Sequence, residues 1–441
     1  MKKILTLKKI LLLLAISNFF VLYAQEKKEV ETVYRRSSLN IILLQNGEFL
    51  HKDLVMDAYH KAPFPDKYND HRLKSDEFNQ MDYLDPDAIK KAKETAKQNK
   101  KDNKQNKKNT TSVQKDSKKK DILSKMAIDN YFTQNKIANQ MVAKWFDRKE
   151  DGTFDMDLIH DRGSYDASEM EAQIAKGSIR GLAMLKDAGE ELIKNTFIVV
   201  NKMRFVKNEP IARAIKESAI AAADYIPSDL AKQIAIAAAN ATYLATKDGY
   251  SVWTTSYLYQ LDWSDDIANA FYMDMWMDST NINPDRKILF DTTSIFKMKY
   301  LGYEKAKSLV LIGVGKELKD IIETATIRNI DKVYTKLQKS HDVFKTKTPI
   351  YSVNPIIAKI GLKEGLEPND KYDVLEQVID KKTGLTKYVT VATVKVDKKK
   401  IWDNRYYMGD EEKPKEAELK GTYFKGGGSK VMRGMLLRQV K

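Results

Sequence analysis

The stretch Asn195-Thr196-Phe197-Ile198-Val199-Val200-Asn201 is a run of β-branched and aromatic residues between polar ones. Such a run is typical of a central, buried strand. Residues 168–194, immediately before it, carry apolar residues at helical spacing. A helix that leads directly into a buried strand indicates a layered α/β unit, so we assign residues 122–345 to an α/β main domain.

On the amino-terminal side, residues 25–86 form a strand and helix segment that we expect to pack on the main domain. Ser38 to Leu44 is a short apolar run, which predicts a buried strand. Phe49 to Tyr59 has helical spacing, and the prolines that follow cannot continue a helix. Residues 67–86 are polar, and we expect them to be irregular.

On the carboxy-terminal side, the main domain continues with further helices and strands. Two helices rich in Ala and Ile are expected over 211–246, divided by Pro227, with Ser228 as the cap of the second. The remaining pattern predicts a helix over 122–145, a strand over 250–262, a helix from Ser264 to Trp276, strands at 294–301 and 308–314 within 288–314, and a helix over 317–341.

Residues 346–441 have a different pattern, in which short alternating strands follow one another. Residues 372–379 and 388–396 flank Asp380-Lys381-Lys382-Thr383-Gly384, which is typical of a hairpin. We assign this region to a small β-barrel or sandwich. The predicted fold class is therefore α+β, with a layered α/β main domain followed by the barrel-like domain.

The first 24 residues have the order of a secretory signal peptide: basic residues, an apolar run, and a small residue at a cleavage point. The apolar run from Ile10 to Leu22 is shorter than the roughly 20 residues that a membrane-spanning helix needs. An uncleaved anchor is the alternative. We therefore expect an exported protein, in the periplasm, at the outer membrane or secreted.

The net charge of +15 is concentrated in two places outside the predicted domains. The signal peptide supplies +4 and residues 87–121 supply +8, which leaves +3 for the rest. A nearly neutral body does not indicate a nucleic-acid partner. Residues 87–121 hold almost no apolar side chains, so we expect a disordered linker or insertion. A basic arm that contacts anionic lipid or polymer is the alternative.

A few polar clusters are candidates for chemistry. Asp70-His71-Arg72 and His160-Asp161-Arg162 are similar triplets, which would make an acid/base or anion site if the fold brought them together. Exposed loop polarity is the alternative. Arg35 and Arg36 precede the first strand and are candidates for anion binding. Glu190 lies in an acidic stretch just before the predicted central strand, where a carboxylate pair could do hydrolytic work, although the adjacent Glu191 points to a different side of a helix. The candidate catalytic residues are Asp70, His71, His160, Asp161 and Glu190.

No metal or cofactor site is predicted. The chain has no cysteine, which excludes disulfides and thiolate ligands, and the five histidines lack the spacing of metal ligands. Gly426-Gly427-Gly428-Ser429-Lys430 lacks the pattern of a phosphate-binding loop.

The stretches 34–44, 181–201 and 257–263 resemble an uncharacterised family of exported proteins from Gram-negative bacteria. That resemblance implies export but brings no activity and no functional residues. The order of helices, strands and terminal barrel is also similar to periplasmic assembly proteins of the flagellar assembly protein T and curli-secretion kind, although the lipid-bearing cysteine of the curli protein is absent.

Together these patterns predict a non-enzymatic cell-envelope protein that binds or scaffolds a protein or polymer partner. A hydrolase acting on envelope glycan or peptide is one alternative, and it requires at least two of the candidate catalytic residues to converge in a cleft. Peripheral attachment to an anionic surface through residues 87–121 is another. The oligomeric state is left open.

Overall fold

The computed structural model describes residues 34–85, 87, 90, 112–165, 191–247, 249–310, 317–380, 386–406 and 415–440. Contacts divide the chain into two compact units, Met1–Val33 and Tyr34–Lys441, and all described residues belong to the second. The predicted signal peptide at 1–24, most of the linker at 87–121 and nearly all of the helix at 168–194 lie outside the described residues.

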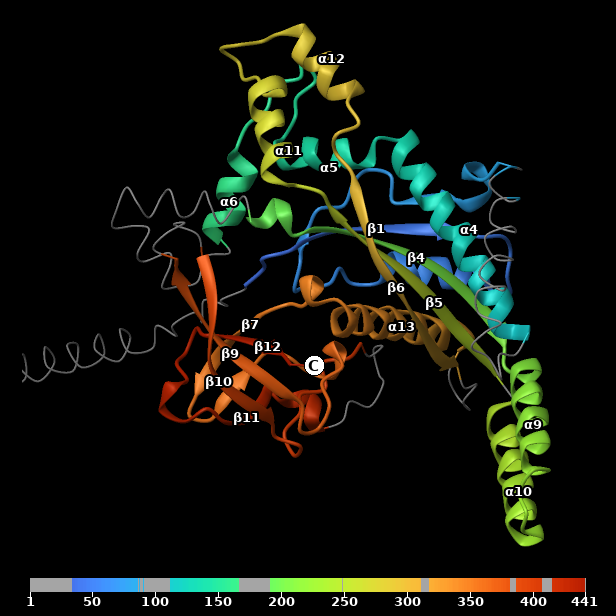
Figure 1. Cartoon of the computed structure of the whole chain (residues 1–441). Coiled ribbons are helices and arrows are strands. Elements are labelled where there is room, and N and C mark those ends of the chain that lie inside the picture. The colour runs from blue at the N-terminus through green and yellow to red at the C-terminus, as the bar shows by residue number, and fades with distance from the viewer. Residues whose placement is uncertain are drawn as a thin grey trace, which may run out of the picture. The chain divides into compact units, whose positions relative to one another are not determined.

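A mixed six-stranded sheet forms the centre of the main domain (Figure 1). Its strand order is β2-β1-β4-β5-β6, and β3 also pairs with β1. β1 is parallel to β2, β3 and β4, whereas β4, β5 and β6 are antiparallel. The strands are β1 (Ser38–Gln45), β2 (Asn69–Asp70), β3 (Glu77–Asn79), β4 (Thr196–Lys207), β5 (Tyr250–Leu261) and β6 (Met298–Val310).

Helices cover both faces of this sheet, which explains why apolar residues follow one another without alternation in β1 (Ile41 to Leu44) and β4 (Phe197 to Val200). Leu39 and Leu43 point to the face covered by α2 (Lys52–Lys61) and α13 (Leu318–Ser340). Ile42 and Leu44 point to the opposite face, covered by α4 (Ser112–Gln134) and α5 (Ile137–Trp145). The main domain therefore has three layers, which fits the layered α/β unit that the sequence predicts.

A third apolar cluster, rich in aromatic residues, lies at the end of the sheet beyond β5. It joins α5 to α11 (Asp265–Ala270), the π-helix η3 (Phe271–Met275) and α12 (Pro284–Thr292). α6 (Asp157–Tyr165) also packs there through Ile159.

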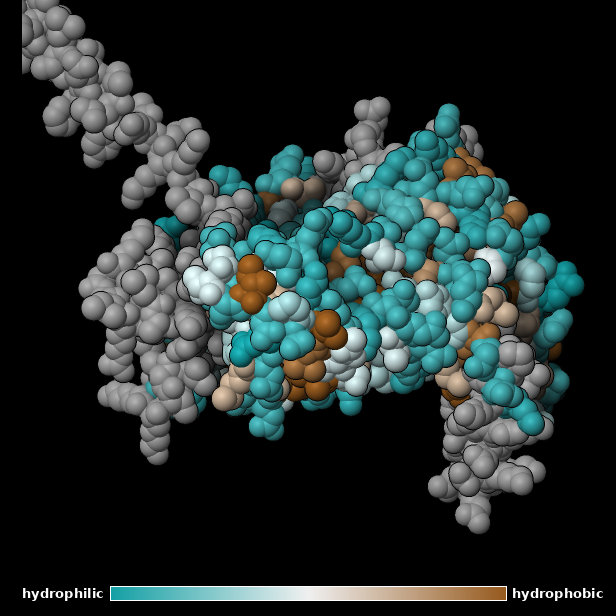
Figure 2. All heavy atoms as spheres, turned by 90° about the horizontal axis from the view of Figure 1, so that it is seen from above, coloured by the Kyte–Doolittle hydropathy of each residue, from teal (hydrophilic) through white to brown (hydrophobic). Residues whose placement is uncertain are grey.

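The surface seen in Figure 2 is mostly hydrophilic, and its hydrophobic side chains gather only in small patches.

Three local predictions for the main domain are wrong. Residues 67–86 are not irregular throughout, because they form β2, β3 and η1 (Gln80–Tyr83). The helix expected from Ile122 begins at Ser112, inside the predicted linker, and Asp121 is buried where its carboxylate pairs with Lys305 at 2.6 Å.

The third correction concerns residues 288–314. Instead of separate strands at 294–301 and 308–314, one long strand, β6, continues through the charged residues between them. Leu258 pairs with Gly302 and Tyr259 pairs with Tyr300, so Leu301 is an extra residue that forms a β-bulge. Residues 288–292 are helical, in α12, because Asn283 caps that helix and Pro284 fits its first turn.

α9 (Glu209–Ala223) and α10 (Asp229–Thr246) form a helical hairpin between β4 and β5. The hairpin extends away from the sheet (Figure 1). The Ser228 hydroxyl caps α10 by accepting a hydrogen bond from the Ala231 N–H, as the sequence predicts. Only Ala212, Ala223 and Ala239 are buried in these two helices.

The carboxy-terminal region is a closed antiparallel barrel with strand order β10-β11-β8-β7-β12-β9, which confirms the predicted α+β fold. Ile350, Val374, Val394, Phe424 and Leu437 fill its interior. Its strands are β7 (Thr348–Val353), β8 (Ile356–Ala358), β9 (Lys371–Ile379), β10 (Thr386–Val396), β11 (Thr422–Gly426) and β12 (Leu436–Gln439).

Short helical turns connect these parts: η4 (Asp342–Phe344), η5 (Leu362–Glu364), η6 (Lys415–Glu418) and η7 (Gly428–Lys430). β9 and β10 form the predicted hairpin. Among the helices in the described ranges, none is both long and apolar enough to cross a membrane.

Candidate functional site

The two predicted polar triplets meet in the fold, through His71 and Arg162. The His71 ring is fully buried, with Nδ1 3.0 Å from an Arg162 nitrogen and Nε2 3.0 Å from the Met141 carbonyl oxygen. A guanidinium can only donate and a carbonyl can only accept, so Nδ1 accepts and Nε2 carries the proton. Both ring nitrogens of His71 are therefore used within the protein.

Trp145 forms the floor of this cluster. The His71 ring stacks on Trp145 with a centroid distance of 4.8 Å, and the Arg162 guanidinium lies 4.7 Å from the same ring. Arg162 also donates to the Asp70 carbonyl at 2.8 Å, and Trp145 donates to the Thr196 hydroxyl. Burial, together with the nearby Arg162 charge, lowers the pKa of His71 to about 3. The imidazole is thus neutral, and the cluster joins β2, α5, α6 and β4.

Of the other candidate catalytic residues, only the side chains of Asp70 and Asp161 are described, and neither carboxylate is joined to the His71 ring. The Asp70 carboxylate pairs with the exposed Arg72 at 2.6 Å. Burial raises the pKa of Asp70, but the hydrogen bonds from Arg72 outweigh burial and hold that pKa below its usual value. Asp161 is exposed on α6. Glu190 and the side chain of His160 lie outside the described residues.

Arg35 and Arg36 lie where the main domain contacts the barrel. Arg35 donates to the Asp66 carbonyl at 2.7 Å. Arg36 is buried and donates to the Tyr34 hydroxyl at 3.2 Å, and Gln377 of β9 donates to the same hydroxyl. These contacts lie within the protein, and those of Arg36 connect the chain before β1 to the barrel.

A pocket of about 230 Å³ lies between α13 and the segments around η5 and Arg405. Four cationic side chains and one carboxyl group line it, together with small polar residues. Within the described residues, the Asp331 carboxyl has no hydrogen-bond partner. Burial raises the pKa of Asp331 to about 7, although the Lys363 charge opposes that rise. The pocket is lined by Ser308, Arg328, Asp331, Lys332, Thr335, Leu362, Lys363, Gly365 and Arg405.

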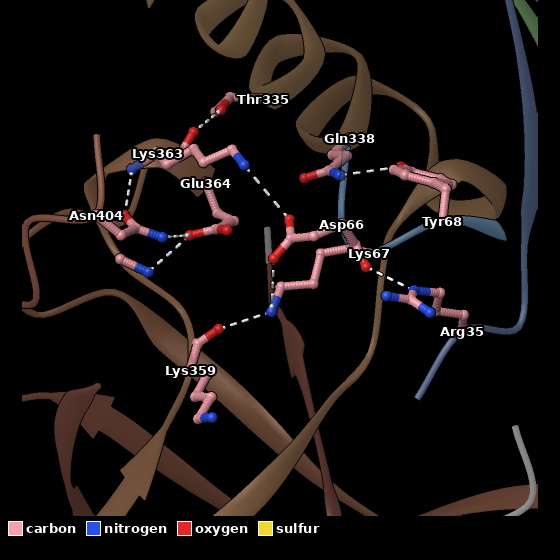
Figure 3. A network of polar contacts seen from close by, with 11 residues as sticks. Arg35, Asp66, Lys67, Tyr68, Thr335, Gln338, Lys359, Lys363, Glu364 and Asn404 are labelled. Atoms are coloured by element: carbon pink, nitrogen blue, oxygen red, sulfur yellow. Dashed lines mark hydrogen bonds and ion pairs between the residues drawn. The ribbon is translucent and has the colours of Figure 1, made fainter. Parts of the chain in front are cut away.

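Lys363 holds one side of this pocket through a network that Figure 3 shows. Its ammonium is 3.4 Å from Asp66, its N–H donates to Asn404, and its carbonyl accepts from Thr335 of α13. Burial lowers the pKa of Lys363, but the nearby Asp66 and Asp331 carboxylates outweigh this and raise it above its usual value. The network therefore connects α13, residues 66–68 and the barrel.

Asp331 with a pKa near 7 can exchange a proton at neutral pH, and the surrounding cations can attract an anion. Sequence reasoning missed this pocket because Asp331, Lys363 and Arg405 are far apart in the chain. One signal was available: Asp331 sits one turn after Ile327 and one turn before Thr335, within the buried side of α13. Among the described residues, no cluster of three or more His, Cys, Asp or Glu side chains suits a metal ion.

A second kind of candidate site is the surface of the α9–α10 hairpin. Tyr243 of α10 faces α9, because its hydroxyl donates to Glu209 and its ring lies under Lys216. On the opposite side of α10, apolar side chains are exposed. These residues, which we call the outer seam, are Leu230 (70% exposed), Ile234 (62%), Ala237, Ala241 and Leu244 (62%).

No family model matches the chain, and no curated protein matches it.

Proposed function

We propose that this protein is exported to the cell envelope and acts there as a non-enzymatic binding or scaffolding protein. The observation that carries the proposal is the outer seam of α10. A helix in a two-helix hairpin needs one apolar side, which packs on its neighbour. α10 has two apolar sides, because both its outer seam and the side that faces α9 carry apolar residues. A row of exposed Leu and Ile side chains is typical of a protein-binding surface.

The surroundings of His71 support a binding role over hydrolysis at the predicted residues. A general base needs a free lone pair within reach of a substrate proton. The Nδ1 lone pair of His71 accepts from Arg162, and the side chain is fully buried. Asp161 points to solvent elsewhere on α6, so it does not complete an acid/base pair with His71.

The charges at the tip of the hairpin favour a protein partner over a lipid bilayer. Asp224 pairs with Lys232 at 2.9 Å, and Asp229 is exposed beside them. Insertion tip first would carry these charges into the hydrocarbon, at about 3 kcal/mol for each charge at the centre. A partner helix can cover the outer seam and leave these charges in water.

The test is a pair of lysine substitutions on α10 in cells that produce the full chain. Ile234→Lys places a charge within the outer seam, whereas Thr242→Lys places the same charge at an exposed position on the flank. After cross-linking in intact cells, we expect the high-mass complexes of the wild type to persist in Thr242→Lys and to disappear in Ile234→Lys. Equal complexes in both variants would remove the support for a binding role.

Export has a separate test, because the predicted signal peptide makes a precise claim about the mature chain. Mass spectrometry of the protein from the envelope fraction should find Gln25 at the amino terminus. Recovery of the chain from the cytosol with Met1 still attached contradicts export.

The hydrolase alternative is favoured by one observation, the Asp331 pocket, rather than by the residues first considered. A carboxyl group with a pKa of about 7 is suited to acid or base chemistry. Purified protein should then release soluble fragments from cell-wall glycan or peptide, and Asp331→Asn should abolish the release. No release by the wild type excludes this alternative for those substrates.

Attachment through residues 87–121 remains the third possibility, and its basic composition is the reason for it. It predicts binding to anionic vesicles that weakens as salt is added and that is lost when the part of the segment before α4, residues 87–111, is deleted.

A further inference from the structure

We propose that the outer seam of α10 pairs with the outer seam of a second copy of this chain, in antiparallel orientation. This inference rests on the proposed binding function and names its partner. The residues of the seam are spaced by four, three, four and three positions. That spacing averages 3.5 residues, which is the repeat that lets one helix pack along another. The pattern therefore fits a helix of similar kind as the occupant.

The side-chain sizes along the seam are complementary to themselves when the second helix runs in the opposite direction. In one antiparallel register, Leu230 faces Ala241 of the second copy and Ile234 faces Ala237 of the second copy. By symmetry, the two alanines of the first copy face the two large residues of the second. Each layer then holds one large and one small side chain, which allows close and even packing.

The remaining exposed groups fit the same register. Tyr225 at the hairpin tip is 89% exposed, and this register brings it beside Leu244 of the second copy. Asp224 at the tip, which also pairs with Lys232 of its own chain, comes near Lys247 of the second copy, so opposite charges meet at each end. Antiparallel helix dipoles also attract. From Gln233 to Thr246, α10 has no charged residue whose burial would oppose pairing.

The position of the hairpin is compatible with this pairing. α9 and α10 extend away from the sheet (Figure 1). Antiparallel pairing therefore places the two main domains at opposite ends of a four-helix arrangement, whereas parallel pairing would bring them side by side. Because α9 already covers the inner side of each α10, the two outer seams become the centre of the four helices.

The absence of cysteine from the chain makes a direct test possible. We suggest two single variants of the full mature protein, Leu230→Cys and Ala241→Cys. In the proposed register these two positions face each other, whereas each lies about 16 Å along the axis from its own counterpart. Under mild oxidation, an equimolar mixture should form disulfide-linked dimers, and each variant alone should not. Self-linking of either variant alone indicates parallel pairing and overturns the proposal.

Analytical ultracentrifugation of the unmodified protein gives the second measurement. The wild type and Thr242→Lys should sediment as dimers, and Ile234→Lys should sediment as a monomer. Ala237→Ile should also weaken the dimer, because two large residues then meet, and adding Ile234→Ala to it should restore the dimer. If the double variant Ile234→Ala and Ala237→Ile forms the dimer again, the weak dimer of the single variant cannot be the result of a folding defect.

The outcomes separate this inference from the proposed function. A wild-type chain that sediments as a monomer overturns self-pairing. If Ile234→Lys nevertheless loses its complexes in cells, the binding function stands with a different partner. If the wild type is a dimer but Ile234→Lys keeps all its complexes in cells, self-pairing stands and the scaffolding role through this seam fails.

Discussion

The helices α13 and α10 carry apolar residues at similar spacing but have opposite environments. α13 buries eleven of its 23 residues between the sheet and the barrel, whereas α10 buries only Ala239 of its 18. The spacing of apolar residues therefore predicts that each helix has an apolar side, but it does not predict whether the same chain covers that side. Equivalent substitutions in the two helices should separate folding energy from binding energy.

The largest effect is expected for Leu337→Ala in α13. Leu337 is fully buried in the core between α13 and the sheet. Removing its side chain loses buried apolar surface and leaves a cavity, which costs about 3 kcal/mol. Urea denaturation should show this loss in the free energy of unfolding. A loss below about 1 kcal/mol would mean that α13 is not the covered helix that we describe.

A smaller loss is expected for Asn329→Leu, which changes the polar part of the same helix. The Asn329 amide donates to the Thr254 hydroxyl at 2.7 Å and to the Val252 carbonyl at 3.3 Å. Leucine is similar in size but leaves those groups of β5 without this partner, at a cost of about 2 kcal/mol. Thermal unfolding measures it, and Thr254→Val in the same background should recover part of the loss.

The next prediction concerns the pH dependence that Asp331 gives to α13. Its folded pKa of about 7 lies above the usual 3.8, so the folded state holds a proton that the unfolded state releases. Stability should therefore fall as pH rises from about 4 to about 7, by at most about 1.4 kcal/mol for each pH unit.

Asp331→Asn has no proton to lose and should not show this fall. The free energy of unfolding of the variant minus that of the wild type should rise by about 1 kcal/mol between pH 6 and pH 7.5. His71 acts in the opposite direction, since its lowered pKa makes stability rise with pH, but it is present in both proteins and does not affect the difference. A difference that stays constant with pH contradicts the raised pKa.

The smallest effect on folding is expected for Leu230→Ala in α10, which is the same chemical change as Leu337→Ala. Leu230 is 70% exposed, so the free energy of unfolding of a dilute, monomeric sample should change by less than about 0.5 kcal/mol. The dissociation constant of the dimer should rise instead, by at least about tenfold. A large loss of monomer stability would show that the seam is covered within one chain.

The sequence predicts the elements whose signals are local. Pro227 divides α9 from α10, Ser228 caps the second helix, and the alternating residues of β9 and β10 identify the barrel hairpin. β6 was predicted as two strands because Glu304, Lys305 and Lys307 interrupt its apolar pattern. Pairing with β5 stabilises those residues in a strand all the same, and no local signal shows that pairing.

The candidate sites have the same limit, because they depend on contacts between residues that are distant in the sequence. The two polar triplets were expected to act together if they met, and they do meet, but through Arg162 and inside the protein. The pattern of residues gives neither the burial of His71 nor the stacking of its ring on Trp145. The Asp331 pocket requires α13, η5 and Arg405 to converge, which only the tertiary structure establishes.

The parallel pairing of β1 with β4 has a consequence for how the chain must fold. Ser38 pairs with Thr196, so the first strand meets its main partner only after more than 150 further residues have been made. Until then β2 and β3 can pair with only one edge of β1, and the segment Leu39-Asn40-Ile41-Ile42-Leu43-Leu44 keeps an open edge of the type that joins other chains. Nascent molecules should depend on a chaperone that holds this segment while synthesis continues, and changes that delay the arrival of β4 should increase aggregation more than they alter the finished protein.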